Sequence, residues 1–200
     1  MIIRSSNAFF IHIPKTGGHT ISNVMGGYHK NRDRKHGRHI KPEQYAKLYP
    51  DEWPSFYKFT FVRNPWDKVI SYLTGLRKDG KQIREDDEYF QNYVKSIRDC
   101  IRELKNNPIL NKVHMQLQTS WLLNDKGKPY KYNYIGRTEN FNEDMNNILS
   151  DLGLSKREEF KRTFVSTRRR DYREYYDEET RDVVADIYKK DIEYLGYTFD

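Results

Sequence analysis

Cysteine is nearly absent from this sequence, because Cys100 is the only one among 200 residues. A single thiol forms no intrachain disulfide, and it argues against a structural zinc cluster, which requires several thiolate or imidazole ligands. We expect Cys100 to pack as a small side chain in a helix. No apolar run is long enough to span a membrane, and the first predicted strand begins too near the N-terminus to leave room for a signal peptide. A cytoplasmic location is therefore expected.

Apolar residues are scarce as well, since they make up 36% of the chain and the mean hydropathy is −1.01. A chain of 200 residues without an obvious linker nevertheless suffices for a core, so we predict one domain, residues 1–200, under a highly charged surface. The net charge of +7 favours anionic partners. The 16 tyrosines suit either stacking on sugars or bases or ordinary half-buried packing.

Short apolar segments separated by helical patterns organise the chain. Strands are predicted at residues 8–13, 57–62 and 132–135, and helices at residues 20–27, 42–49, 66–76, 85–105, 114–123, 141–152 and 178–195, with a helical turn at 155–160. Strands that alternate with helices in this way favour a parallel sheet with crossover helices. The predicted fold class is α/β, with a central parallel β-sheet flanked by helices.

The segment FFIHIPKTGGHTI near the N-terminus joins a strand, a tight turn and the start of a helix. Gly17 and Gly18 allow backbone N–H groups to approach a ligand closely, and the helix N-terminus that follows favours an anion. Lys15 adds a positive charge, and Thr16 and Thr20 add hydroxyl donors. The usual phosphate-loop pattern is absent because the lysine precedes the glycines, so a glycine-rich turn with an incidental lysine is the alternative. We predict a cradle for phosphate or sulfate.

A second anion-binding pattern follows the next predicted strand. Arg63 ends that strand, and Ser71 lies eight residues further on, in a helix that begins with Asn64 as N-cap and Pro65 in the first turn. A guanidinium suits a dianionic phosphate, and a helical hydroxyl can reach the same oxygens. Because ligands bind beyond the carboxyl ends of parallel strands, we expect Lys15 and Arg63 at one edge of the sheet. Two such anion sites fit a nucleotide that is phosphorylated at both ends of its ribose.

At these residues the sequence resembles the PAPS-dependent sulfotransferases, most closely their carbohydrate-type branch. IPKTGGHT resembles their 5′-phosphosulfate loop, and FVRNPWDKVISY resembles their 3′-phosphate motif. HMQLQTSWL, YIGRTENFNEDM and YKKDIEYLGYTFD resemble further segments of the family, so the likeness spans nearly the whole chain. The resemblance implies a P-loop-like three-layer fold. It also implies transfer of a sulfuryl group from 3′-phosphoadenosine 5′-phosphosulfate (PAPS) to an acceptor hydroxyl, with release of PAP and no metal.

The same resemblance implies the donor-binding residues. Lys15 would neutralise the charge that develops on the leaving phosphate, helped by the backbone N–H groups of residues 16–20. The predicted donor contacts are Lys15, Thr16, Gly17, Gly18, His19, Thr20, Arg63, Ser71, Ser166 and Arg168. The last two belong to a late basic loop that lacks the family's Arg-Lys-Gly. Which of Arg168, Arg169 and Arg170 would reach the nucleotide therefore stays open.

The predicted catalytic base is His39, which begins the segment HIKPEQY and is similar in position to the catalytic histidine of carbohydrate-type enzymes. An imidazole titrates near neutral pH and can take a proton from an alcohol as attack begins. His36 is the alternative base or an acceptor contact, and Glu43 would replace both histidines if neither serves. His12 is expected to be a core histidine.

The predicted acceptor is a carbohydrate, although a small alcohol, a phenol or a peptide tyrosine fits the same chemistry. The predicted acceptor-binding residues are His36, His114, Gln118 and Arg137. Gln118 matches a recurrent glutamine of the family, and Arg137 suits a structural pairing with Glu139 equally well. The oligomeric state is not readable from the sequence.

Two other functions share parts of this pattern. A nucleoside-kinase-like phosphotransferase would use the same strand–loop–helix, but it should also carry Gly-Lys-Ser/Thr and an aspartate that holds Mg²⁺, and neither is recognisable. A non-catalytic module for nucleic acid or another polyanion would use the basic tracts at residues 28–41 and 167–173. No recognition helix, zinc motif or RNA-binding motif accompanies these tracts, so nucleic acid is not a predicted partner.

Overall fold

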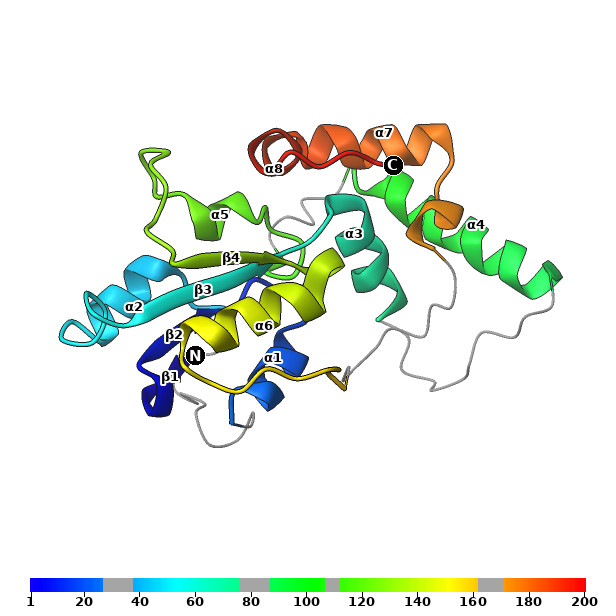
Figure 1. Ribbon diagram of the computed structural model, residues 1–200. Helices are drawn as coiled ribbons and strands as arrows, with labels where there is room; N and C mark the ends of the chain where they lie inside the picture. The colour runs from blue at the N-terminus through cyan, green and yellow to red at the C-terminus, as the bar shows by residue number, and fades with distance from the viewer. Residues whose placement is uncertain (27–37, 76–86, 107–111, 162–170) are drawn as a thin grey trace. The chain divides into compact units, whose positions relative to one another are not determined.

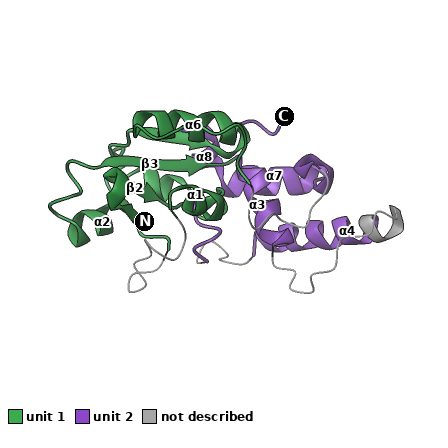
Figure 2. Cartoon of the chain, turned by 60° about the horizontal axis from the view of Figure 1, so that its bottom comes forward, with its two compact units in different colours: residues 1–63, 118–164 green, residues 64–117, 165–200 purple. Residues whose placement is uncertain are grey.

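The computed structural model shows a chain that forms two compact units (Figure 2). Unit 1 comprises residues 1–63 and 118–164, and unit 2 comprises residues 64–117 and 165–200. The single domain expected from the sequence stays a prediction. The structure describes residues 1–26, 38–75, 87–106, 112–161 and 171–200.

Unit 1 contains a four-stranded sheet (Figure 1). Its strands are β1 (Ile2–Ile3), β2 (Ala8–Ile11), β3 (Tyr57–Val62) and β4 (Tyr134–Arg137), and they lie in this order. β2, β3 and β4 run parallel, with Phe10 opposite Phe59 and Phe59 opposite Tyr134. β1 pairs antiparallel with β2, since the chain reverses through a 3-10 turn and Asn7, which has a φ of 46°. The predicted α/β class is confirmed, and the sheet is mixed rather than wholly parallel.

The limits of β3 are those that the sequence predicts, whereas β2 and β4 differ from their predicted limits. β2 ends at Ile11 instead of residue 13, because its ladder with β3 stops at the pair Ile11–Thr60. β4 spans Tyr134–Arg137 instead of residues 132–135, so it ends later and also begins later than predicted. One reason is that the side chain of Asn133 accepts the N–H of Lys58 at 2.8 Å, in the place where a strand carbonyl would otherwise accept it.

Helices cover both faces of the sheet within unit 1 (Figure 1). On one face, Phe10, Phe59 and Phe61 pack with α1 (Gly18–Val24) and α6 (Phe141–Asp151). On the other face, the Phe9 ring lies 5.1–5.7 Å from four aromatic rings in and after α2 (Pro42–Leu48), which are Tyr45, Tyr49, Trp53 and Phe56. Because side chains alternate along a strand, the apolar residues of β2 supply both faces and specify the three layers.

Unit 2 is helical. Its elements are α3 (Pro65–Thr74), α4 (Asp87–Glu103), the 3-10 helix η4 (Tyr172–Tyr175), α7 (Glu178–Ile187) and α8 (Lys189–Leu195). Asn64 caps α3 as predicted, since its side chain accepts the N–H of Trp66 at 3.1 Å and Pro65 begins the helix. The core of this unit includes Trp66, Ile70, Ile101, Val184 and Tyr188.

Three helical predictions are wrong in part. The helix predicted at residues 178–195 is interrupted at Tyr188, whose buried hydroxyl donates to the carbonyl of Met115 at 2.7 Å. Backbone hydrogen bonds of helical spacing still reach this residue, from its N–H to the Val184 carbonyl and from the Ile192 N–H to its own carbonyl, so the interruption is short. The helix predicted at residues 114–123 is reduced to α5 (Thr119–Leu122), and residues 155–160 are not helical.

The apolar spacing that predicts α4 places Val94, Ile97 and Ile101 in the core of unit 2. Cys100 lies off this apolar face and is exposed, so its predicted packing role is wrong. Position 100 is three residues after Ile97 and four before Leu104, so the helical repeat alone does not distinguish it from the core positions.

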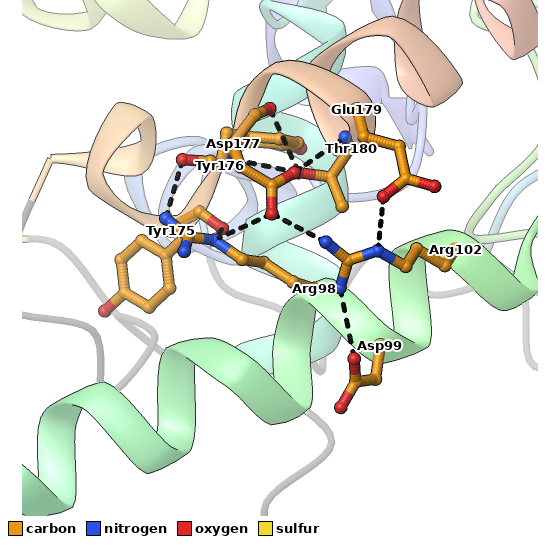
Figure 3. Close-up of polar contacts among 8 residues, drawn as sticks. All are labelled: Arg98, Asp99, Arg102, Tyr175, Tyr176, Asp177, Glu179 and Thr180. Atoms are coloured by element: carbon orange, nitrogen blue, oxygen red, sulfur yellow. Dashed lines mark hydrogen bonds and ion pairs between the residues drawn. The ribbon is translucent and has the colours of Figure 1, made fainter.

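An ion-pair network joins α4 to the start of α7 (Figure 3). Arg102 binds the carboxylates of Asp177 and Glu179, each at 2.7 Å. Asp177 also caps α7 by accepting the N–H of Thr180 at 2.9 Å. Partial burial opposes ionisation, but the hydrogen bonds from Thr180 and the charges of Arg102 and Arg98 hold the pKa of Asp177 below its usual value. Because these groups are partly solvated, the network contributes more to geometry than to stability.

Candidate active site

The loop between β2 and α1 forms the first part of the candidate site. Lys15 and Gly17 both have left-handed backbone conformations, with φ values of 69° and 81°. Thr16 is buried between them, and its hydroxyl donates to the carbonyl of Ile13 at 2.8 Å, which holds the turn. A positive φ is uncommon for a residue with a side chain, and such backbone strain concentrates at ligand-binding loops.

The glycine pair has a packing reason in addition to its predicted role toward a ligand. A Cβ at Gly18 would lie 1.9 Å from Nε2 of His12, and a Cβ at Gly17 would lie 3.3 Å from the ring of Phe141. His12 is buried, as predicted, with its ring 5.3 Å from that of Phe10. Gly18 therefore lets the loop lie directly on a buried imidazole.

Arg63 lies immediately after β3 and contacts this loop. Its Nη1 donates to the carbonyl of Lys15 at 3.0 Å, so the structure brings the two predicted phosphate-binding residues of unit 1 together. Gln118 holds the backbone of Arg63 from the other side: Arg63 N–H donates to its Oε1 at 2.9 Å, and its Nε2 donates to the Arg63 carbonyl at 2.7 Å. The three residues form a continuous chain of hydrogen bonds.

The electrostatics of the loop favour an anion. Burial, and then the positive charge of Arg63, lower the pKa of Lys15 to about 8. Burial, followed by the charges of Arg38 and Lys15, also lowers the pKa of His19. Positive neighbours add to the effect of burial on the pKa of both groups, so a bound anion would offset this repulsion and raise both pKa values.

His39 lies beside the same loop, within unit 1. Its Nδ1 is 3.0 Å from the carbonyl oxygen of His12, and the two rings are 4.5 Å apart. A hydrogen bond to a carbonyl requires the proton on Nδ1, so Nε2 carries the lone pair of the neutral ring. Burial, and then repulsion from the protonated form of His39, lower the pKa of His12 well below its usual value, which keeps the His12 ring neutral. The stand-in base, Glu43, accepts a hydrogen bond from the hydroxyl of Tyr130 at 2.5 Å.

The other described residues with predicted roles belong to separate units. In unit 2, Ser71 is buried on α3 and His114 is exposed. In unit 1, Thr20 is buried on α1. Arg137 ends β4, where its backbone N–H donates to Asp144 at 2.5 Å. Roles for these residues stay predictions.

Several predicted residues lie outside the described part of the chain, namely His36, Ser166, Arg168, Arg169 and Arg170. Within the described residues, no group of three or more histidine, cysteine, aspartate or glutamate side chains is placed to hold a metal ion. None of the helices in the described ranges has both the length and the apolar character that a membrane crossing requires.

Two contacts of the site have no signal in the sequence. The pairing of Gln118 with Arg63 spans 55 positions, and the one from His39 to the His12 carbonyl spans 27. Neither contact follows from a local motif, because any element that the fold brings near can reach a backbone group. The match of Gln118 to a recurrent glutamine of the family singled this residue out, but it predicted a role in acceptor binding.

Comparison with known proteins gives one match. A family model described as "Sulfotransferase family" matches residues 1–198, a range that includes the loop after β2, His39, Arg63 and Gln118. Neither the search of curated proteins nor the search of solved structures found a match.

Proposed function

Because this chain belongs to the sulfotransferase family and is a sulfuryl-transferring enzyme, we propose that its donor is PAPS and its acceptor is a carbohydrate hydroxyl. The donor assignment is supported mainly by the contact between the Arg63 guanidinium and the Lys15 carbonyl. This contact brings together two basic residues that follow neighbouring parallel strands. Family membership favours sulfuryl transfer over the kinase-like and the non-catalytic alternatives.

The proposed donor site assigns one cation to each phosphorylated end of the nucleotide. Lys15 and the loop around it bind the 5′-phosphosulfate, and the positive φ values of Lys15 and Gly17 are of the kind found in anion-binding turns of the backbone. Arg63 binds the 3′-phosphate through the coplanar N–H groups of its guanidinium. The spacing of eight residues between Arg63 and Ser71 indicates Ser71 as a second contact. An adenine nucleotide without a 3′-phosphate would leave Arg63 without this anion and bind more weakly.

The proposed reaction is an in-line displacement at sulfur. The acceptor oxygen forms a bond to sulfur while the bond between sulfur and the 5′-phosphate oxygen breaks, and PAP leaves with the electron pair. Lys15 stabilises the charge that develops on this leaving oxygen. His39 Nε2 takes the acceptor proton, in the tautomer that its Nδ1 contact with the His12 carbonyl selects.

The carbohydrate acceptor is supported by the resemblance to carbohydrate-type enzymes and by the net charge of +7, which suits an anionic glycan. The acceptor assignment is tested by incubating the enzyme with radiolabelled PAPS and a panel of candidate acceptors. The panel contains neutral and anionic glycans, small alcohols and tyrosine peptides. Label on a glycan alone supports the proposal, and label on tyrosine peptides alone overturns it.

The donor assignment is tested by calorimetric titration of PAP, with AMP as the ligand that lacks the 3′-phosphate. We expect micromolar binding of PAP, much weaker binding of AMP, and loss of the difference in Arg63→Ala. Lys47→Ala, which removes an exposed cation from α2, is the matched control and should bind like the wild type. Absence of PAP binding by the wild-type protein would remove the proposed donor.

Donor binding should weaken as the pH rises above about 8, the pKa of Lys15 in the ligand-free protein. A bound phosphate raises this pKa, because the opposite charge favours the protonated form. Below this pH Lys15 is already charged; above it, binding takes up a proton and the affinity falls. Calorimetry in buffers of different ionisation enthalpy measures the uptake. Lys15→Arg keeps its charge and should show none, so equal uptake in that variant would contradict the assignment.

A further inference from the structure

Gln118 forms a paired contact that resembles the pairing of a neighbouring strand. It is completely buried, and its carboxamide both accepts from and donates to the backbone of Arg63, at 2.9 and 2.7 Å. The ladder between β3 and β4 ends one residue earlier, at the pair Val62–Arg137. Gln118 therefore supplies the polar partners that the sheet no longer provides for Arg63.

This contact fixes the point from which the Arg63 side chain extends. With its N–H and carbonyl both bound by one buried side chain, the Arg63 backbone has a defined orientation where the strand ends. The guanidinium then reaches the carbonyl of Lys15 at 3.0 Å, in the residue of the loop with a φ of 69°. Gln118 is thus connected through hydrogen bonds to Arg63 and, beyond it, to the backbone of Lys15, without a charge of its own.

We propose that Gln118 is a positioning residue for the donor nucleotide, acting through Arg63, and is not an acceptor-binding residue. The inference rests on the proposed function, because it assigns Arg63 to the 3′-phosphate. The carboxamide is directed at the Arg63 backbone, and its burial leaves no exposed surface to offer an acceptor. A residue in this position affects recognition of the 3′-phosphate more than recognition of the rest of the nucleotide.

The test compares Gln118→Met with Gln116→Met in calorimetric titrations of PAP and AMP. Methionine keeps the length of the side chain and removes both hydrogen bonds. Gln116→Met makes the same chemical change two positions earlier and keeps the backbone carbonyl that Lys68 binds at 2.8 Å. Loss of two hydrogen bonds should lower PAP affinity about tenfold or more in Gln118→Met. The ratio of PAP to AMP affinity should fall as well, with Gln116→Met like the wild type.

A mutant cycle separates positioning from a general structural effect. In the Arg63→Ala background, Gln118→Met should cause no further loss of PAP affinity, because its effect passes through the missing guanidinium. Gln118→Leu removes the same two hydrogen bonds with a neutral side chain, so it should lower the ratio in the same way, and it serves if Gln118→Met does not fold.

The outcomes distinguish the proposed donor from the positioning role of Gln118. A wild-type protein that does not bind PAP would contradict the proposal that PAPS is the donor. Wild-type selectivity in Gln118→Met, with PAP bound normally by every variant that retains Arg63, would overturn the positioning role alone. Lower thermal stability with an unchanged PAP-to-AMP ratio would overturn it too, since a merely structural residue behaves in that way.

Discussion

Lys15→Met is expected to lower the turnover number for sulfuryl transfer by about 10²–10³-fold, the usual effect of removing one preorganised charge from a developing anion. The ammonium group would stabilise the leaving phosphate most strongly as the bond to sulfur breaks. Its removal should therefore lower kcat more than it weakens the binding of PAPS. Initial rates with radiolabelled PAPS and a fixed glycan acceptor measure both quantities.

The stability of Lys15→Met provides the control for this experiment. The folded protein lowers the pKa of Lys15 to about 8, below its value in the unfolded chain, so the protonated amine opposes folding at neutral pH. Methionine removes this unfavourable charge, and the midpoint of thermal unfolding should not fall. A stable variant with wild-type kcat would show that the loop does not act on the leaving group.

His39→Asn is expected to lower kcat by about 10²–10⁴-fold, the usual contribution of a general base. The asparagine amide can replace Nδ1 as the donor to the His12 carbonyl, while the atom that would accept the proton is lost. The substitution therefore removes the proposed chemistry and keeps the local contact. Affinity for PAP should stay close to that of the wild type, since the proposed donor contacts come from other residues.

Single-turnover measurements with preformed enzyme and PAPS separate this effect from slow product release. His36→Asn is the comparison, because the sequence leaves that residue as the alternative base. Turnover retained in His39→Asn and lost in His36→Asn would transfer the assignment to His36. Equal retention of turnover in both variants would indicate that the base is Glu43 or another residue.

The main strands were predictable because each is an apolar segment bounded by strong signals. β3 has its predicted limits, and β2 lies within its predicted segment, although it ends at Ile11, before the proline and the glycines. β1 was missed because Ile2–Ile3 is two residues long and pairs only through a turn at Asn7. No periodicity exists over two residues, so pattern-based reasoning cannot detect such a strand.

The terminal helix departs from its predicted pattern at one residue. The apolar spacing after Glu178 continues past residue 188, yet the helix divides into α7 and α8 at Tyr188, where φ is −103° and ψ is 17°. The site shows the same limit. Motif spacing indicated Lys15 and Arg63, but the glutamine that holds Arg63 is recognisable only once the fold brings distant segments together.

The contact of Gly18 with the His12 ring has a consequence for protein engineering. One residue, His12, supports the loop through its imidazole and holds His39 through its carbonyl oxygen. The loop after β2 and His39 are therefore expected to keep their arrangement only if they are transferred together. A graft of the loop onto another parallel sheet would have to include His12 and the segment around His39. Without His12, Gly18 would lose the imidazole against which it packs.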